Sequence, residues 1–220
     1  TMCDLFGLSC NAEDRATMSL PIFRREGRFN QSGWGLAYYD GNRAIVERNP
    51  EDINVSIRFS EVIKEAKSNN IISHLRYATA GTDGTRNVCE ANCHPFTDNY
   101  LDRDWVFAHN GVVRRALDHR HPSSEGETDS EQVFRHIMDY VRNYRSEGIK
   151  GIYPGFVKAL KALFSQFGRD IDFNMLLSDG ASMFVFTHHS DSNKRMHMLR
   201  REKGYGGATL VSTRKLTNEN

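Results

Sequence analysis

The chain has 220 residues, of which 39% are hydrophobic and 26% charged, and its formal net charge is +1. This composition predicts a globular protein with a substantial core and argues against a disordered chain. The balanced charge gives no electrostatic case for binding nucleic acid or a membrane. No apolar run approaches the roughly 20 residues that span a bilayer, and the chain shows no signal peptide. We expect a cytoplasmic location, where the four cysteines form no structural disulfide.

Short apolar runs punctuated by glycine or asparagine predict strands, and longer runs with a 3.6-residue period predict helices. In chain order the pattern predicts strands over 3–9, 33–39 and 44–48, a helix over 60–68 with Ser60 as N-cap, and strands over 70–78 and 105–111. A helix follows over 129–148, with Val133, Ile137, Tyr140 and Val141 on one face, and another over 151–168, which ends at Gly168. Strands over 174–180, 182–188, 195–201 and 208–213 complete the chain.

The strands flank a central pair of helices, without the regular alternation of a parallel doubly wound sheet. We therefore expect an α+β fold: two mostly antiparallel sheets with helices packed outside them, in one domain over 1–220. Segments 80–104 and 117–128 are polar and predict loops. Long loops in a compact domain tend to be functional.

Cys3 follows directly on the only methionine near the start of the chain. If Thr1 and Met2 are removed, its thiol and a free α-amine belong to one residue, and an amine with a pKa of about 8 can act as base for that thiol. With both residues retained, the nitrogen of Cys3 would be an amide without basicity. Taken alone, a cysteine is more often inert than catalytic.

Four further stretches place polar residues at the ends of predicted strands or at a helix start: SGWGLAYY (32–39), HLRYATAG (74–81), AHNG (108–111) and ETDSE (127–131). Each also has a purely structural interpretation. Asn110-Gly111 fits a hairpin turn, and Asp129 fits an ordinary helix start. Arg76 fits a surface position, and Trp34 fits the core.

Taken together, these residues fit the hydrolysis of an amide. This reaction needs a nucleophile, a base and donors that face the developing oxyanion. Cys3 with its amine supplies the first two, and the side-chain amide of Asn110 with the N–H of Gly111 supplies the donors. An amino-acid substrate also needs a guanidinium for its carboxylate and a carboxylate for its ammonium. Arg76 and Asp129 are such a pair.

The rival interpretation is a zinc site, built from Cys89, Cys93 and His94 with His109 or Cys10. The CxxxCH spacing is not that of paired zinc knuckles, and no second close pair follows it. No glycine-rich loop fits a phosphate site either. We expect no metal ion and no cofactor.

The stretches TMCDLFG, HLRYATAG, FAHNGVV and ETDSEQVF, in this order, resemble the glutaminase domain of class II glutamine amidotransferases. SGWGLAYY and NCHPF are typical of the standalone branch of that family, and the resemblance covers residues 2 to about 215. It implies an N-terminal-nucleophile (Ntn) hydrolase with a four-layer αββα sandwich. Relatives commonly carry tryptophan at the position of Tyr77, a conservative difference.

The resemblance also implies roles for single residues. Cys3 is then the nucleophile, and Asn110 and Gly111 form the oxyanion hole. Arg76 anchors the substrate α-carboxylate with support from Tyr77 to Thr79, and Asp129 binds the α-ammonium. His109 and His74 orient other groups, and His94 shapes a loop near the pocket.

Three functions remain open at this point. The chain is a glutaminase that supplies ammonia to a separate synthase subunit, or a standalone hydrolase of another γ-glutamyl amide or peptide bond. A catalytically silent domain that senses glutamine is the third, and the intact set of motifs argues against it. The sequence does not separate the first two, because the acyl half of the substrate is the same in both.

Overall fold

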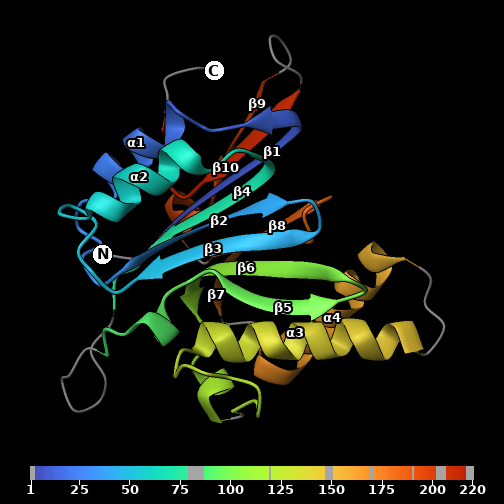
Figure 1. Ribbon diagram of the computed structural model, residues 1–220. Helices are drawn as coiled ribbons and strands as arrows, with labels where there is room; N and C mark the ends of the chain where they lie inside the picture. Colours follow the sequence, from blue (N-terminus) through green and yellow to red (C-terminus); the bar gives the residue numbers. More distant parts are fainter. Residues whose placement is uncertain are drawn as a thin grey trace.

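The computed structural model describes residues 3–78, 87–118, 120–146, 151–168, 171–189, 191–201 and 207–216. Figure 1 shows two β-sheets stacked against each other, with one pair of helices above them and a second pair below. All strand pairs in both sheets are antiparallel. The predicted α+β sandwich of four αββα layers is therefore confirmed.

The first sheet has six strands in the order β3-β2-β4-β1-β10-β9. Its strands are β1 (Asp4–Asp14), β2 (Trp34–Asp40), β3 (Arg43–Asn49), β4 (Ser68–Leu75), β9 (His197–Arg201) and β10 (Ala208–Ser212). Helices α1 (Ser19–Glu26) and α2 (Ile57–Glu65) cover its outer face, where Phe23 and Phe59 are fully buried against strand residues such as Phe6 and Trp34. Trp34 is thus a core residue, as its structural interpretation predicts.

The second sheet has four strands in the order β5-β6-β7-β8. They are β5 (Phe96–Tyr100), β6 (Arg103–Val112), β7 (Asp172–Ser178) and β8 (Met183–His188). Helices α3 (Asp129–Ser146) and α4 (Ile152–Phe167) cover its outer face. The predicted stripe of α3 is confirmed, because Val133, Ile137 and Val141 are buried and Tyr140 packs beside them.

Three elements differ from the predictions. Helix α1 was not predicted, and it begins with Ser19 and carries Pro21 in its first turn. Helix α2 begins three residues before the predicted start, because Ser56 rather than Ser60 is the N-cap and its Oγ accepts from the Phe59 N–H at 3.1 Å. Strand β5 lies inside the predicted loop 80–104, where its polar side chains hide the strand pattern. Three short 3₁₀ turns complete the described elements: η1 (Glu90–Asn92), η2 (Arg114–Asp118) and η3 (Ser192–Lys194).

The two sheets face each other through an apolar layer that includes Leu5, Ile72, Ala108 and Leu176. Successive side chains of a strand point to opposite faces of its sheet. Asn110, two residues after Ala108, therefore lies on the same inner face. Together with the start of β1, this end of the layer is polar, and the candidate site lies there. No helix among the described residues is long and apolar enough to cross a membrane.

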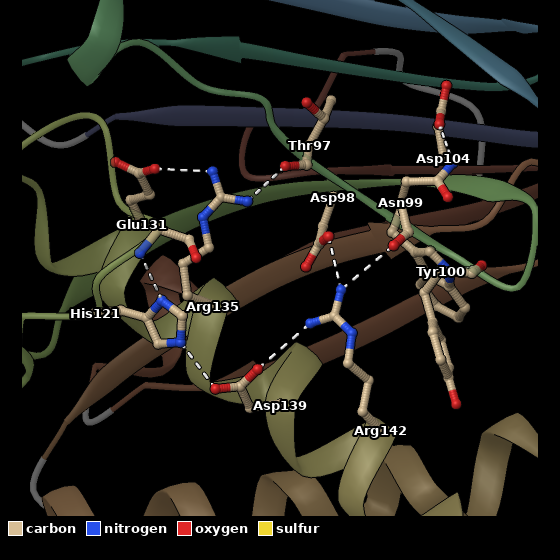
Figure 2. A network of polar contacts seen from close by, with 12 residues as sticks. Thr97, Asp98, Asn99, Tyr100, Asp104, His121, Glu131, Arg135, Asp139 and Arg142 are labelled. Carbon is tan, nitrogen blue, oxygen red and sulfur yellow. Dashed lines mark hydrogen bonds and ion pairs between the residues drawn. The ribbon is translucent and has the colours of Figure 1, made fainter.

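The exposed edge of β5 is held by two arginines from α3 (Figure 2). Arg135 donates to the carbonyl of Thr97 at 2.7 Å, and Arg142 reaches the carbonyl of Asn99 at 3.4 Å and pairs with Asp98 at 2.7 Å. These contacts occupy backbone acceptors that an edge strand would otherwise offer to another chain. They also hold α3, and with it the helix start at Asp129, against the sheet.

Glu131 is the most buried ion-pairing carboxylate of this network. Its side chain is 1% exposed, pairs with Arg135 at 3.0 Å and accepts from the N–H groups of Glu125 and Gly126 at 3.0 and 2.7 Å. It therefore fixes the segment that leads into Asp129.

We expect Glu131→Ala to lower the free energy of unfolding by about 3–5 kcal/mol, because it removes the buried carboxylate that pairs with Arg135 and accepts from the N–H groups of Glu125 and Gly126, the second of which is buried. Urea denaturation measures the change. Glu13→Ala is the matched control: it removes a Lys67 pair of 3.1 Å whose side chains are about half exposed, and it should cost about 0–1 kcal/mol. An equal loss of unfolding free energy in the two variants would contradict the stabilising role given to Glu131.

Candidate active site

The start of β1 and the end of β4 bring Cys3 beside Tyr77. The two strands are antiparallel with Asp4 opposite Leu75, so the residue before Asp4 lies next to the residues after Leu75. The N–H of Tyr77 donates to the Cys3 Sγ at 3.2 Å, and the Sγ lies 3.5 Å from the Tyr77 carbonyl. Cys3 is half-buried and has no disulfide partner. The backbone of Tyr77, rather than its ring, makes this contact.

Asn110 approaches Cys3 from the other sheet. Its side-chain Nδ2 donates to the main-chain carbonyl of Cys3, and its side chain is almost fully buried. The residue lies within β6, directly opposite Asn174 of β7. The structure thus contradicts the hairpin-turn interpretation of Asn110-Gly111, since the strand continues to Val112.

Gly111 follows in a conformation that favours glycine, with a φ of +149°. A Cβ here would overlap the carbonyl oxygen of Asp172 and crowd the His109 ring. The close approach of β7 therefore explains the glycine in structural terms. It also leaves the backbone beside Asn110 free of a side chain.

Asp129 and Arg76 lie close enough to Cys3 to act on it electrostatically, with opposite signs. Arg76 is buried, and its Nη1 donates to the carbonyl of Ser32 at 3.3 Å. The Asp129 Oδ2 accepts from the N–H of Val113 at 2.6 Å, and its Oδ1 accepts from the Ser130 N–H at 2.8 Å. Asp129 thus fixes the start of α3 against the end of β6. A carboxylate with two such bonds still has acceptor capacity for an ammonium.

His109 lies on the opposite face of β6 from Asn110, toward the helices. Its Nδ1 is 2.8 Å from the hydroxyl of Ser130, and its ring packs 4.6 Å from that of Phe173. This position suits the orienting role, since it connects β6 to the helix start at Asp129. Thr79, expected to support the substrate anchor, lies outside the described residues.

Burial raises the pKa of the Cys3 thiol to about 11, against the opposing effects of the Tyr77 N–H and of Arg76. The thiol is therefore protonated at neutral pH. A nucleophilic attack by Cys3 then requires a base that takes the proton as the new bond forms.

A model of the class II glutamine amidotransferases matches residues 2–216, nearly the whole chain. The chain belongs to this family. A putative glutamine amidotransferase of Haemophilus influenzae is 31% identical over 219 residues, which cover 96% of this chain and 69% of that protein. An uncharacterized protein of Methanocaldococcus jannaschii is also 31% identical, over 95% of this chain and 57% of its own length. The chain thus spans little more than half of that relative.

A partial match relates the chain to a named hydrolase. The γ-glutamyl-hercynylcysteine sulfoxide hydrolase of Mycobacterium tuberculosis is 31% identical over 123 residues, 54% of this chain and 49% of the hydrolase. A hydrolase named for a γ-glutamyl compound therefore occurs among the relatives.

Solved structures share the four-layer αββα fold of this family member. The glutamine phosphoribosylpyrophosphate amidotransferase of Bacillus subtilis superposes with a TM-score of 0.68 at 17% identity, over 96% of this chain and 42% of its own. A predicted glutamine amidotransferase of Pseudomonas aeruginosa gives 0.58 at 21% identity, over 99% and 92% of the two chains. At these identities the likeness concerns the fold alone.

Two residues at the candidate site escaped the sequence analysis. Asp4, directly after Cys3, is buried and accepts from Asn30 at 2.6 Å, from Thr213 at 3.0 Å and from Arg214 at 2.8 Å. Asn174, the second, interrupts the apolar strand β7 and donates to Asn110. A polar residue within a buried apolar strand was the available signal in the second case.

A hollow of about 460 Å³ lies between β3 and β5, lined by Ala44, Val46, Thr97, Asp98, Asn99 and Asp104. It contains none of the residues around Cys3. Its acidic groups are paired, Asp98 with Arg142 and Asp104 with Arg43. Within the described ranges, no group of three His, Cys, Asp or Glu side chains is placed to hold a metal ion.

Two buried histidines, with their rings tilted against each other, lie near Arg76. The rings of His74 and His94 are 4.1 Å apart, and the described residues offer no hydrogen-bond partner to either nitrogen of His94. Burial and the nearby Arg76 lower the pKa of His74 to about 3, and burial next to His74 lowers the pKa of His94 well below 6.5. Both rings are neutral in the folded protein at neutral pH.

The neutral state of these two histidines in the folded protein makes its stability depend on pH. Below the ordinary pKa of 6.5 the unfolded chain binds a proton on each ring while the folded protein does not, so stability falls as the pH falls. Between pH 6 and pH 5 we expect each to contribute a loss approaching about 1.4 kcal/mol. His94→Gln should remove about half of the stability loss that the two histidines together cause between pH 6 and pH 5. Urea denaturation at the two pH values measures the loss. An unchanged loss would contradict the neutral state of His94.

Proposed function

We propose that the chain hydrolyses the side-chain amide of glutamine to glutamate and ammonia, with Cys3 as the nucleophile. The observation that carries the proposal is the contact between the two sheets at Asn110. Its Nδ2 donates to the Cys3 carbonyl, so an amide donor lies directly beside the residue that bears the thiol. Arg76 and Asp129 supply the charges that an α-carboxylate and an α-ammonium require.

The reaction then runs in two steps. The Sγ of Cys3 attacks the γ-carbonyl carbon of glutamine, and the thiol proton passes to the α-amine of Cys3. The carbon–nitrogen bond breaks, and ammonia leaves with that proton. Water then attacks the thioester, gives glutamate and returns a proton to the sulfur. In both tetrahedral intermediates the Asn110 amide and the Gly111 N–H face the oxyanion.

The base in this scheme is the α-amine of Cys3, so the proposal requires Cys3 to be the first residue of the active enzyme. The raised pKa of the Cys3 thiol means that its attack needs a base, and the α-amine would lie on the same residue. An amine with an ordinary pKa of about 8 is partly unprotonated at neutral pH and can take up the proton.

The second candidate is the hydrolysis of another γ-glutamyl amide or peptide bond. The match to the mycobacterial γ-glutamyl hydrolase favours it, and the anchors for the glutamyl end would be the same. Free ammonia from glutamine would instead call for a consumer, and a separate synthase subunit is the partner that we propose for that case.

A substrate comparison tests the proposal and separates the two candidates. Protein with Cys3 as its first residue, verified by intact mass, is incubated with glutamine or with a set of γ-glutamyl amides and dipeptides, and released glutamate is measured. Faster hydrolysis of glutamine supports the glutaminase, and faster hydrolysis of a γ-glutamyl compound supports the second candidate. Failure to release glutamate from any of them would overturn both.

A further inference from the structure

Three polar side chains form a ladder across the second sheet and end at Cys3. In the strand register Asn110 of β6 is opposite Asn174 of β7, and Asn174 is opposite Thr187 of β8. The Asn174 Nδ2 donates to the Asn110 Oδ1 at 3.2 Å, and the Thr187 hydroxyl donates to the Asn174 Oδ1 at 2.6 Å. Asn174 is fully buried, although its strand neighbours Phe173, Met175 and Leu176 are apolar. A buried amide within such a strand has a cost that its hydrogen bonds must offset.

The orientation of the Asn174 amide is set by a group that can only accept. Its Nδ2 also donates to the backbone carbonyl of Lys194 in η3, at 2.8 Å. A flipped amide would face this carbonyl and the Asn110 Oδ1 with its own oxygen, which gives two repulsive contacts. The hydroxyl of Thr187 does not select an orientation, because it can donate or accept.

The amide of Asn110 is oriented in turn. Its Oδ1 receives the Asn174 donor and its Nδ2 donates to the Cys3 carbonyl, so both partners favour the same orientation. A flip of Asn110 would place an oxygen against that carbonyl and against any oxyanion that forms beside it. An oxyanion hole works because its donors are already oriented when the charge develops.

We infer that Asn174 is a positioning residue for the reaction at Cys3. Its hydrogen bond to the Lys194 carbonyl fixes its own amide, which in turn holds the Asn110 amide with the Asn110 Nδ2 toward the oxyanion. The inference deepens the proposed function and rests on it for the catalytic consequence. It gives the connection between β8 and β9, which contains Lys194, a part in catalysis without any contact to the substrate.

The test compares two variants that each remove a hydrogen bond of Asn174. Asn174→Leu has nearly the same shape but no donor, so kcat should fall by about 10–100-fold with little change in KM. Thr187→Val is the matched control: it removes only the bond to the Asn174 Oδ1, so it should lower the melting temperature and leave kcat within about twofold. In an Asn110→Ala background, Asn174→Leu should have little further effect on kcat, because it acts through Asn110.

A second readout does not depend on turnover. The side-chain NH₂ signals of Asn110 in ¹⁵N-labelled protein are identified by their loss in Asn110→Ala. They should keep their shifts and slow solvent exchange in Thr187→Val, and shift and exchange faster in Asn174→Leu. Unchanged signals in Asn174→Leu would overturn the inference even if the enzyme hydrolyses glutamine. A wild-type protein that releases no glutamate would overturn the proposed function and the catalytic part of the inference, whatever the signals show.

Discussion

Replacing Cys3 by alanine should reduce glutamine hydrolysis to on the order of 10⁻⁴–10⁻⁶ of the wild-type rate, because the variant has no nucleophile to form the thioester. The fold should remain, since the hydrogen bonds of the Cys3 Sγ within the described residues are made with the backbone of Tyr77. The measurement is kcat for protein whose first residue is the alanine, with circular dichroism to verify the fold.

Cys10→Ala is the matched control for this experiment. Cys10 is also half-buried and forms no disulfide. Its thiol faces the carbonyls of Ser68 and Asn69, at the far end of the pairing between β1 and β4. This variant should keep wild-type activity. A glutamine analogue with a diazo-ketone should alkylate Cys3 alone in the wild type. Alkylation of Cys10, Cys89 or Cys93 with Cys3 untouched would refute the nucleophile assignment.

The fold was predictable because its strands carry their own signals. Runs such as 105–111 and 174–180 are apolar enough to predict strands, and both are found at these places in β6 and β7. Strand β5 was not predictable in the same way. Its sequence FTDNY alternates buried and exposed positions over only five residues, and its polar side chains serve contacts with α3 that exist only in the folded protein.

The candidate site was predictable as a set of residue types, but not as a geometry. The sequence singled out Cys3, Arg76, Asn110 and Asp129; in the structure Asn110 donates to the Cys3 carbonyl, and Arg76 and Asp129 lie close enough to act on the Cys3 thiol electrostatically. The strand predicted over 105–111 includes Asn110, but Asn-Gly after an apolar run also fits a turn, and the sequence did not separate the two interpretations. Asn174 was missed although it is a polar residue in an apolar strand, because its contact with Asn110 depends on the register between β6 and β7, which the local sequence does not give.

Asn110→Asp should lower kcat by about 10²–10³ and leave KM nearly unchanged, because the donor that it removes acts on charge present only in the transition state. The substitution preserves the shape of the side chain. Its second oxygen can still accept from the Asn174 Nδ2, but the atom that faces the Cys3 carbonyl changes from a donor into a negatively charged oxygen. Steady-state kinetics with glutamine gives both constants.

The control for the added charge is Asn42→Asp, in the exposed turn between β2 and β3, where aspartate suits the backbone as well as asparagine. It should leave kcat and KM unchanged. Because Asn110 is buried against Asn174 and Cys3, the variant at this position should also lose thermal stability, and activity must be measured below its unfolding transition. The decisive quantity is therefore kcat of the folded fraction. Near-wild-type turnover by folded Asn110→Asp would leave the contact with the Cys3 carbonyl as a structural bond between the two sheets, and the oxyanion would need another donor beside the Gly111 N–H.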